Sequence, residues 1–299
     1  MSGTRGGTRR PGTPPVTSRL GWAPYALLLP SLLFFVVFFA TPGVQAFALA
    51  FQAPDGTFGL ASVQRMLGDP KFSGALTTTV ALVILVIPIQ LVLAMSMALV
   101  INSRLKGQGL WLYVYALPLG ISELAAGIVW VSIFTQSGWL NSILLGLGVI
   151  DRPITWQSAE TPWLLIMCVV IAEAWRATSI IMIILVAGLQ SIPREFLEAA
   201  DVCGATTWQK IRRVVLPMLR PSLQVAVILR TIMAFQTFAT VIALAGSGLN
   251  VLAGEAQRWA TDINDEHVAA AYAGLILVLS LAGTVLFLVL LPTREEQQA

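Results

Sequence analysis

The sequence is poor in the side chains that most metal and catalytic sites use. Its 299 residues include one histidine, His267, and two cysteines, Cys168 and Cys203. A single histidine excludes a two-histidine metal site. The cysteines lack metal-ligand spacing and lie in unlike surroundings, one apolar and one polar, so we expect neither a metal centre nor a disulfide. No metal or cofactor is predicted to be bound by this chain.

Charge is also scarce, at 11% of the residues, whereas hydrophobic residues make up 57% and the mean hydropathy is +0.80. A soluble domain is roughly one quarter charged. Runs of about 20 apolar residues cross a bilayer as helices, because a helix satisfies its own backbone groups. The sequence therefore predicts an all-α integral membrane protein. The six expected spans are 22–47, 74–101, 110–134, 163–189, 222–244 and 268–291.

The chain ends differ from this membrane domain, which we place at 22–292. Residues 1–21 are rich in Gly, Thr, Pro and Arg, so we expect a disordered basic tail, and residues 293–299 form a second tail. The apolar run 22–50 carries no charge and exceeds the roughly 7–15 residues of a signal peptide's apolar region, which favours a retained span over a cleaved one. The short apolar run 143–150 is expected to be a surface or re-entrant piece.

The distribution of basic residues predicts the orientation of the chain. Cytoplasmic loops are enriched in Lys and Arg. One set of loops and tails holds Arg5, Arg9, Arg10, Arg19, Arg104, Lys106, Arg194, Lys210, Arg212, Arg213, Arg220 and Arg294. The other set holds only Arg65, Lys71, Arg152 and Arg258. We therefore expect both termini and the loop 190–221 in the cytoplasm.

The loop 190–221 has the pattern of two short helices joined by a glycine. Pro193 suits a first helical turn, and Gly204 suits a left-handed helix end. Thr206 or Thr207 would cap a second helix, and Pro217 marks the return towards the next span. Such a projecting unit could dock into a groove on a partner, or lie on anionic lipid with the help of its basic residues.

The loop also resembles a known motif. Its Glu198-Ala199-Ala200, Gly204-Ala205 and Leu216-Pro217 resemble the EAA loop of ABC-importer permeases. Segments 25–30, 69–72, 173–176, 187–193 and 235–238 resemble the carbohydrate-uptake branch of that family, which includes maltose, trehalose and glycerol-phosphate permeases. The chain departs from the family pattern at Cys203, where Asp is usual, and at Ala239 and 246–248.

The resemblance implies a permease subunit of a binding-protein-dependent importer in a bacterial or archaeal cell membrane, moving a sugar or sugar-like solute inward. The expected partners are a dimer of ATP-binding subunits holding ATP and Mg, a second homologous permease, and an extracytoplasmic solute-binding protein. Glu198, Ala199 and Gly204 would contact the ATPase. The chain contains no Gly-x-x-x-x-Gly-Lys-Ser/Thr motif, so we expect it not to be an enzyme.

Charged residues within the spans are costly in lipid and usually face a partner or a cavity. Glu173 and Arg176 are three residues apart and are predicted to pair, either as a structural ion pair or beside a pathway. Arg230 is expected to reach towards the cytoplasmic surface. Glu123 follows a predicted break at 118–122.

A substrate pathway would need aromatic faces and polar groups if the solute is a sugar. The candidates are Glu123, Trp130, Phe235, Gln236 and Phe238, although aromatic residues at such positions also serve simple packing or face lipid. An alternative function is an ion-gradient-driven secondary transporter of a small polar solute. An intramembrane protease would need a Ser and a His inside the membrane, and only the short tail suggests nucleic acid, so we expect neither.

Overall fold

The computed structural model describes residues 23–52, 56–103 and 107–292. Within these ranges the chain forms helices and one isolated antiparallel bridge, between Gln52 and Phe58, so the predicted all-helical class is confirmed. The predicted tails 1–21 and 293–299 lie outside the described residues, as do Trp22, Arg104 and Lys106. The chain divides into two units, Met1–Ala46 and Phe47–Ala299.

The first unit contains α1 (Ala23–Phe35), a π-helical turn η1 (Val36–Ala40) and the beginning of α2 (Thr41–Leu49). Most of its described side chains are apolar, and Leu27, Phe34 and Phe38 are more than half exposed. The π turn precedes Pro42, which has no backbone N–H to donate. The Val36 carbonyl accepts from the Thr41 backbone N–H and also from the Thr41 hydroxyl, the latter at 2.8 Å.

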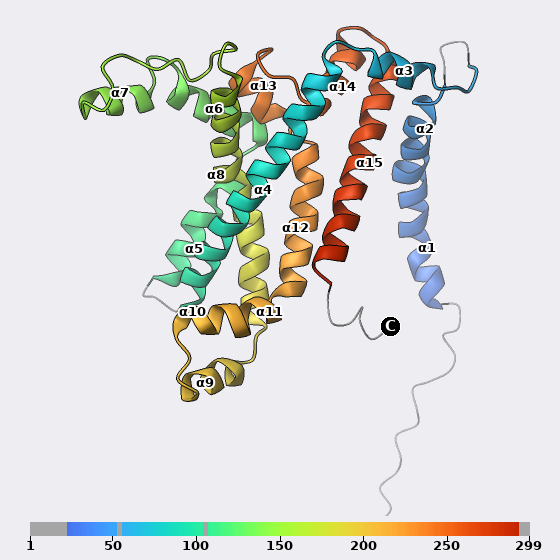
Figure 1. Cartoon of the computed structure of the whole chain (residues 1–299). Coiled ribbons are helices and arrows are strands. Elements are labelled where there is room, and N and C mark those ends of the chain that lie inside the picture. The colour runs from blue at the N-terminus through green and yellow to red at the C-terminus, as the bar shows by residue number, and fades with distance from the viewer. Residues whose placement is uncertain (1–22, 53–55, 104–106, 293–299) are drawn as a thin grey trace, which may run out of the picture. The chain divides into compact units, whose positions relative to one another are not determined.

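The second unit is built around α4 (Phe72–Asn102), α8 (Pro162–Gln190), α12 (Arg220–Phe235) and α15 (Glu266–Leu290) (Figure 1). By length and composition, five stretches of the described chain could cross a membrane. They are Tyr25–Leu49, Phe72–Asn102, Glu123–Gly146, Pro162–Gln190 and Glu266–Leu290. A sixth is possible where Thr207–Met218 meets Arg220–Phe235, with a bend of 70° between them.

The predicted third span is divided near its middle. It consists of α5 (Gln108–Ala116), the 3₁₀ turn η2 (Leu117–Gly120) and α6 (Glu123–Phe134). The side chain of Ser122 accepts a hydrogen bond from the Ala125 backbone N–H at 3.2 Å and caps α6. The break expected at 118–122 is confirmed.

The fifth span was predicted as one helix over 222–244, and this was wrong. Helix α12 ends at Phe235, and α13 (Ala239–Ala245) begins after a gap of three residues. The carboxylate of Glu123 accepts hydrogen bonds from the backbone N–H groups of Phe238 at 3.1 Å and Thr240 at 3.3 Å. A side chain from α6 therefore caps α13, and this long-range contact stabilises a break that the apolar pattern does not reveal.

The apolar run 143–150 belongs to a short helix, α7 (Trp139–Gly146), followed by a turn in which Gly148 has a φ of 68°. The buried side chain of Asn141 holds this region in place. Its amide donates to the carbonyls of Gln136 and Ile154, and its oxygen accepts from the Ile154 N–H and the Trp156 indole. The prediction of a short surface or re-entrant piece fits α7.

Small residues let the helices of the second unit approach closely. A methyl group added to Gly127 of α6 would lie 2.5 Å from the Ala243 Cβ of α13, and one on Gly188 of α8 would lie 2.6 Å from the Ser222 Cβ of α12. Close approach through small residues is a common way for helices to pack in membranes, where water supplies no hydrophobic driving force.

The two ends of the second unit carry different short elements (Figure 1). One end holds α9 (Arg194–Val202), α10 (Thr207–Lys210), the π turn η3 (Ile211–Val215) and α11 (Leu216–Met218). The opposite end holds α3 (Ala61–Leu67) and α14 (Leu252–Thr261).

Candidate functional site: the α9–α10 loop and the buried charges

Helix α9 ends in a hydrogen-bonded left-handed turn. Gly204 has a φ of 72°, its N–H donates to the Asp201 carbonyl at 2.9 Å, and the Ala205 N–H donates to the Ala200 carbonyl at 2.9 Å. These two bonds define a Schellman motif, in which glycine is favoured because it adopts positive φ without strain. The predicted helix end at Gly204 is confirmed, with Pro193 just before the first residue of α9.

The second helix of the loop begins with a capping box. The Thr206 hydroxyl accepts from the Gln209 N–H at 3.3 Å, while the Gln209 side chain accepts from the Thr206 N–H at 2.8 Å. Lys210 also lies 2.6 Å from Asp201 and joins α10 to α9. The sequence 201–210 thus determines its own turn, and the predicted helix–glycine–helix unit is present.

The α9–α10 loop exposes apolar side chains at the end of the molecule. Phe196 is 52% exposed, Val202 is 89% exposed and Trp208 is 68% exposed. Glu198 and Ala199 are exposed as well, and Glu198 also lines a hollow between α9 and the ends of α4 and α8. Val215, by contrast, is buried, so not every apolar side chain of this segment is exposed.

A network of charges is buried where α4, α8, α12 and α13 meet. The Glu173 carboxylate lies 3.2 Å from Arg176 Nη2 and 2.9 Å from Arg230 Nη2. It also accepts from the Thr240 hydroxyl at 2.7 Å. The pairing of Glu173 with Arg176 is confirmed, and two cations surround one carboxylate.

The expectation that Arg230 reaches the membrane surface was wrong. Its side chain is only 1% exposed, and its Nε donates to the Gln90 side-chain oxygen at 2.5 Å. The nearby carboxylate of Glu173 and the amide of Gln90 provide a local partner for the guanidinium, so it need not extend to water. Periodicity along one helix could not reveal these partners, because they lie on other helices.

The five residues predicted to line a substrate pathway do not surround one cavity. Trp130 lines a groove of about 530 Å³ together with Trp175, Gln236 lines another hollow beside α15, and Phe238 lines a third. Phe235 is buried, and Glu123 caps α13. Their role as a pathway therefore stays a prediction.

A polar cluster occupies the end opposite the α9–α10 loop. Asp69 Oδ2 lies 2.6 Å from Arg258 Nη2, 2.7 Å from the Trp259 indole nitrogen and 3.2 Å from the Tyr272 hydroxyl. Burial acts to raise the pKa of Asp69, but the Lys71 backbone N–H, the Trp259 indole and the Arg258 charge outweigh it and hold the pKa below its ordinary value. Sequence reasoning missed this cluster.

Comparison with known families identifies the chain. The sequence profile of the family described as "Binding-protein-dependent transport system inner membrane component" matches residues 25–294. The chain belongs to this family. It is accordingly the membrane component of a binding-protein-dependent ABC importer, and the helical fold with five to six spans agrees with that assignment.

Several relatives cover most of the permease. A probable ABC transporter permease of Brucella suis is 30% identical over 92% of this chain and 98% of its own length. The sn-glycerol-3-phosphate permease UgpA of Pectobacterium atrosepticum is 28% identical over 91% of each chain. The trehalose/maltose permease MalF of Thermococcus litoralis is 32% identical over 58% of each chain.

A solved structure shows the same fold. A bacterial ABC transporter involved in the import of the acidic polysaccharide alginate superposes with a TM-score of 0.75, covering 89% of this permease and 93% of that chain at 23% identity. The same kind of alginate transporter has also been solved with a periplasmic protein bound to alginate pentasaccharide.

Proposed function

We propose that this permease moves a sugar or sugar-like solute into the cytoplasm, driven by ATP hydrolysis on a separate ATP-binding subunit that docks on the α9–α10 loop. The sugar class rests on the relatives that are named for trehalose, maltose and glycerol 3-phosphate. The chain has no nucleotide-binding glycine loop, so its energy must come from a partner. A second permease and an extracytoplasmic binding protein complete the proposed importer.

The exposed apolar side chains of the α9–α10 loop are the observation that carries this proposal. Phe196, Val202 and Trp208 project from a unit whose backbone is already satisfied by its own caps. A rigid helix pair with exposed aromatic anchors suits a groove on a partner, since little ordering entropy is lost on docking. Basic residues of the same segment, including Arg212 and Arg213, would place this end, together with both termini, on the cytoplasmic side.

The ion-gradient alternative receives less support. A carrier of that kind needs an intramembrane carboxylate that is free to take a proton or a sodium ion. Glu173 instead contacts both Arg176 and Arg230, and Glu123 accepts two backbone N–H groups. Both carboxylates are thus engaged by partners within the protein.

Two glycine substitutions provide a matched test of docking. Gly204 and Gly148 have similar φ values, 72° and 68°, and a Cβ added to either would meet no atom within 4 Å. Aspartate at either position costs about 1–2 kcal/mol of backbone strain. We expect Gly204→Asp to abolish ATP-driven uptake in proteoliposomes and co-purification of the ATPase subunit, whereas Gly148→Asp keeps both.

Membrane insertion is measured in parallel for both variants. Normal insertion of Gly204→Asp with lost uptake supports docking on the loop. Full uptake by Gly204→Asp, or equal loss of uptake in Gly148→Asp, would contradict it. Uptake that depends on an ion gradient and does not depend on ATP would contradict the proposed function and support the secondary-transporter alternative.

A further inference from the structure

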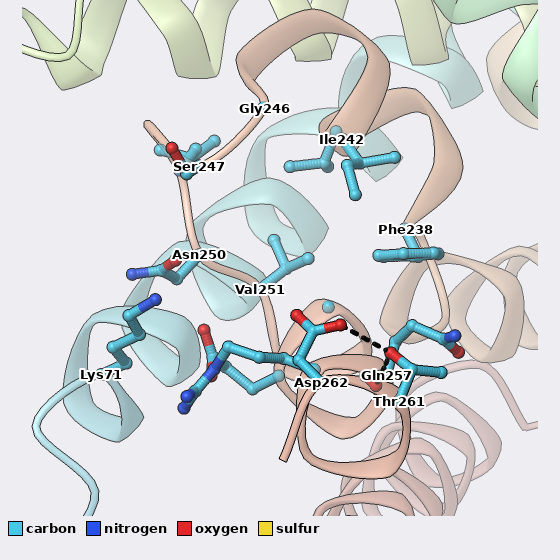
Figure 2. Close-up of a pocket in the computed structure, with 15 residues that line it drawn as sticks. Lys71, Phe238, Ile242, Gly246, Ser247, Asn250, Val251, Gln257, Thr261 and Asp262 are labelled. Carbon is cyan, nitrogen blue, oxygen red and sulfur yellow. Dashed lines mark hydrogen bonds and ion pairs between the residues drawn. The ribbon is translucent and has the colours of Figure 1, made fainter. Parts of the chain in front are cut away.

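A hollow of about 280 Å³ lies at the end opposite the α9–α10 loop, between the start of α4, the helix α13 and the helix α14 (Figure 2). We call it the α13–α14 hollow. One side of it is apolar and is formed by Phe238, Val241, Ile242 and Val251. Lys71, Ser247 and Asn250 lie on the side away from Phe238, whereas Gln257 lies on the same side as Phe238, and Asp262 completes the polar part of the lining. Its volume is close to the lower limit of about 300 Å³ for small-molecule pockets.

The polar part of the lining carries side chains with unused hydrogen-bonding capacity. In the part of the chain that the structure describes, the Lys71 ammonium and the amides of Asn250 and Gln257 form no hydrogen bond or ion pair. Among the described residues, the Asp262 side chain accepts one hydrogen bond, from the Thr261 hydroxyl at 3.0 Å, which leaves its second oxygen available. These groups offer both donors and acceptors to a ligand.

The aromatic wall is held in place from two sides. The Phe238 backbone N–H donates to Glu123, and the ring lies beside α14, where a Cβ added to Gly254 would meet it at an ordinary contact distance of 3.5 Å. Figure 2 shows the Phe238 ring on the side of the hollow away from Lys71 and Asn250. A sugar ring combines a C–H face that packs on an aromatic ring with hydroxyl groups around its edge, which matches these two sides.

The charges around the hollow balance. Lys71 and Arg258 are cationic, and Glu255 and Asp262 are anionic, so the formal net charge of the lining is zero. Arg258 is already paired with Glu255 at 2.5 Å and with Asp69, which leaves one ammonium and one carboxylate facing the hollow. A phosphate or a uronic acid would meet the Asp262 carboxylate without a surplus of positive charge.

We infer that the α13–α14 hollow binds one neutral sugar ring of the transported solute, with the ring against Phe238 and its hydroxyls on Asn250, Gln257 and Asp262. This inference rests on the proposed function and narrows its substrate class to neutral sugars. The hollow lies at the end of the spans away from the ATPase docking loop, where an importer receives its solute.

Saturation-transfer NMR on the full complex in lipid nanodiscs tests the hollow directly. The probes are the methyl glycosides of glucose, galactose, mannose and xylose, each in competition with glucose 6-phosphate. We expect at least one neutral glycoside to receive saturation transfer from the protein. That glycoside should bind about tenfold more tightly than glucose 6-phosphate. Each variant loses one hydrogen bond to the sugar, from the neutral amide in Asn250→Ala and to the charged carboxylate in Asp262→Lys, and each should weaken binding by about tenfold.

Asp262→Lys also gives the lining a net charge of +2 and should shift preference towards glucose 6-phosphate. Asp151→Lys makes the same charge change at an exposed position of the loop between α7 and α8, and should bind like the unchanged protein. The inference is overturned if no neutral glycoside receives saturation transfer. It is also overturned if the Asp262→Lys and Asp151→Lys variants bind the glycosides and glucose 6-phosphate equally well.

ATP-driven uptake of the same sugars separates this inference from the proposed function. If ATP-driven sugar uptake is observed but no sugar binds in the hollow, the hollow is not a sugar site and the proposed importer function is still supported. If no ATP-driven sugar uptake is observed, the proposed function is rejected, and the inference that rests on it is rejected with it.

Discussion

Two ion pairs of equal length hold opposite ends of the second unit. Lys210 lies 2.6 Å from Asp201 in the α9–α10 loop, and Arg258 lies 2.6 Å from Asp69 at the other end. The first pair joins residues nine positions apart, and the Asp201 side chain is 59% exposed. The second joins residues 189 positions apart, and the Asp69 side chain is 5% exposed.

The difference shows how each end is stabilised. The α9–α10 loop is stabilised locally, by a Schellman motif and a capping box, and it leaves apolar surface for a partner. The Asp69 cluster instead joins the start of α4 to α14 and α15, so it stabilises the arrangement of helices. Exposed pairs contribute about 0–1 kcal/mol, whereas hydrogen bonds to buried charged groups contribute about 1.5–3 kcal/mol. Equal distances therefore do not imply equal contributions.

The largest effect is expected where the long-range contacts are most buried. Arg230→Met leaves Glu173 with one cation and Gln90 without its donor, and should lower the free energy of unfolding by about 3–5 kcal/mol. Thermal unfolding in detergent measures the loss. Arg176→Met removes the other cation beside Glu173, but that side chain is 15% exposed, so the loss should be smaller. An equal or larger loss for Arg176→Met would contradict the ranking by burial.

The second test replaces each of the two aspartates, Asp69 and Asp201, by asparagine in separate variants. Asp69→Asn removes the charge opposite Arg258 and weakens the hydrogen bonds that the Asp69 carboxylate accepts from Trp259 and Tyr272. The free energy of unfolding should fall by about 1.5–3 kcal/mol. Asp201→Asn makes the same change in the loop and should cost about 0–1 kcal/mol. The same unfolding assay compares them. Equal costs would show that sequence separation and exposure do not distinguish the two ends.

The smallest effect is a dependence on pH. Because the folded-state pKa of Asp69 is lowered from 3.8, its contribution is complete above that ordinary value and is lost as the pH falls through the folded-state pKa. The difference in unfolding free energy between the unchanged protein and Asp69→Asn should stay constant above about pH 5 and shrink in more acidic buffer. A difference that grows on acidification would have the wrong sign.

The sequence by itself determined the class of protein, the ends of most spans and the α9–α10 loop. Apolar runs of sufficient length specify spanning helices, because the backbone must satisfy itself in lipid. Gly204 and Thr206 specify the turn, because a left-handed glycine and a threonine cap act on neighbours within about five residues. The break before α6 was predictable for the same reason, since Pro118 and Ser122 act locally.

Only the tertiary structure decided which distant residues meet. The position of Arg230 between Gln90 and Glu173, the capping of α13 by Glu123, and the Asp69 cluster all join residues from separate helices. A buried charge or N–H group must find a partner, but its own sequence neighbours do not say which helix supplies it. The sequence therefore determines the helices and their local ends, and packing determines which polar groups pair and where the hollows lie.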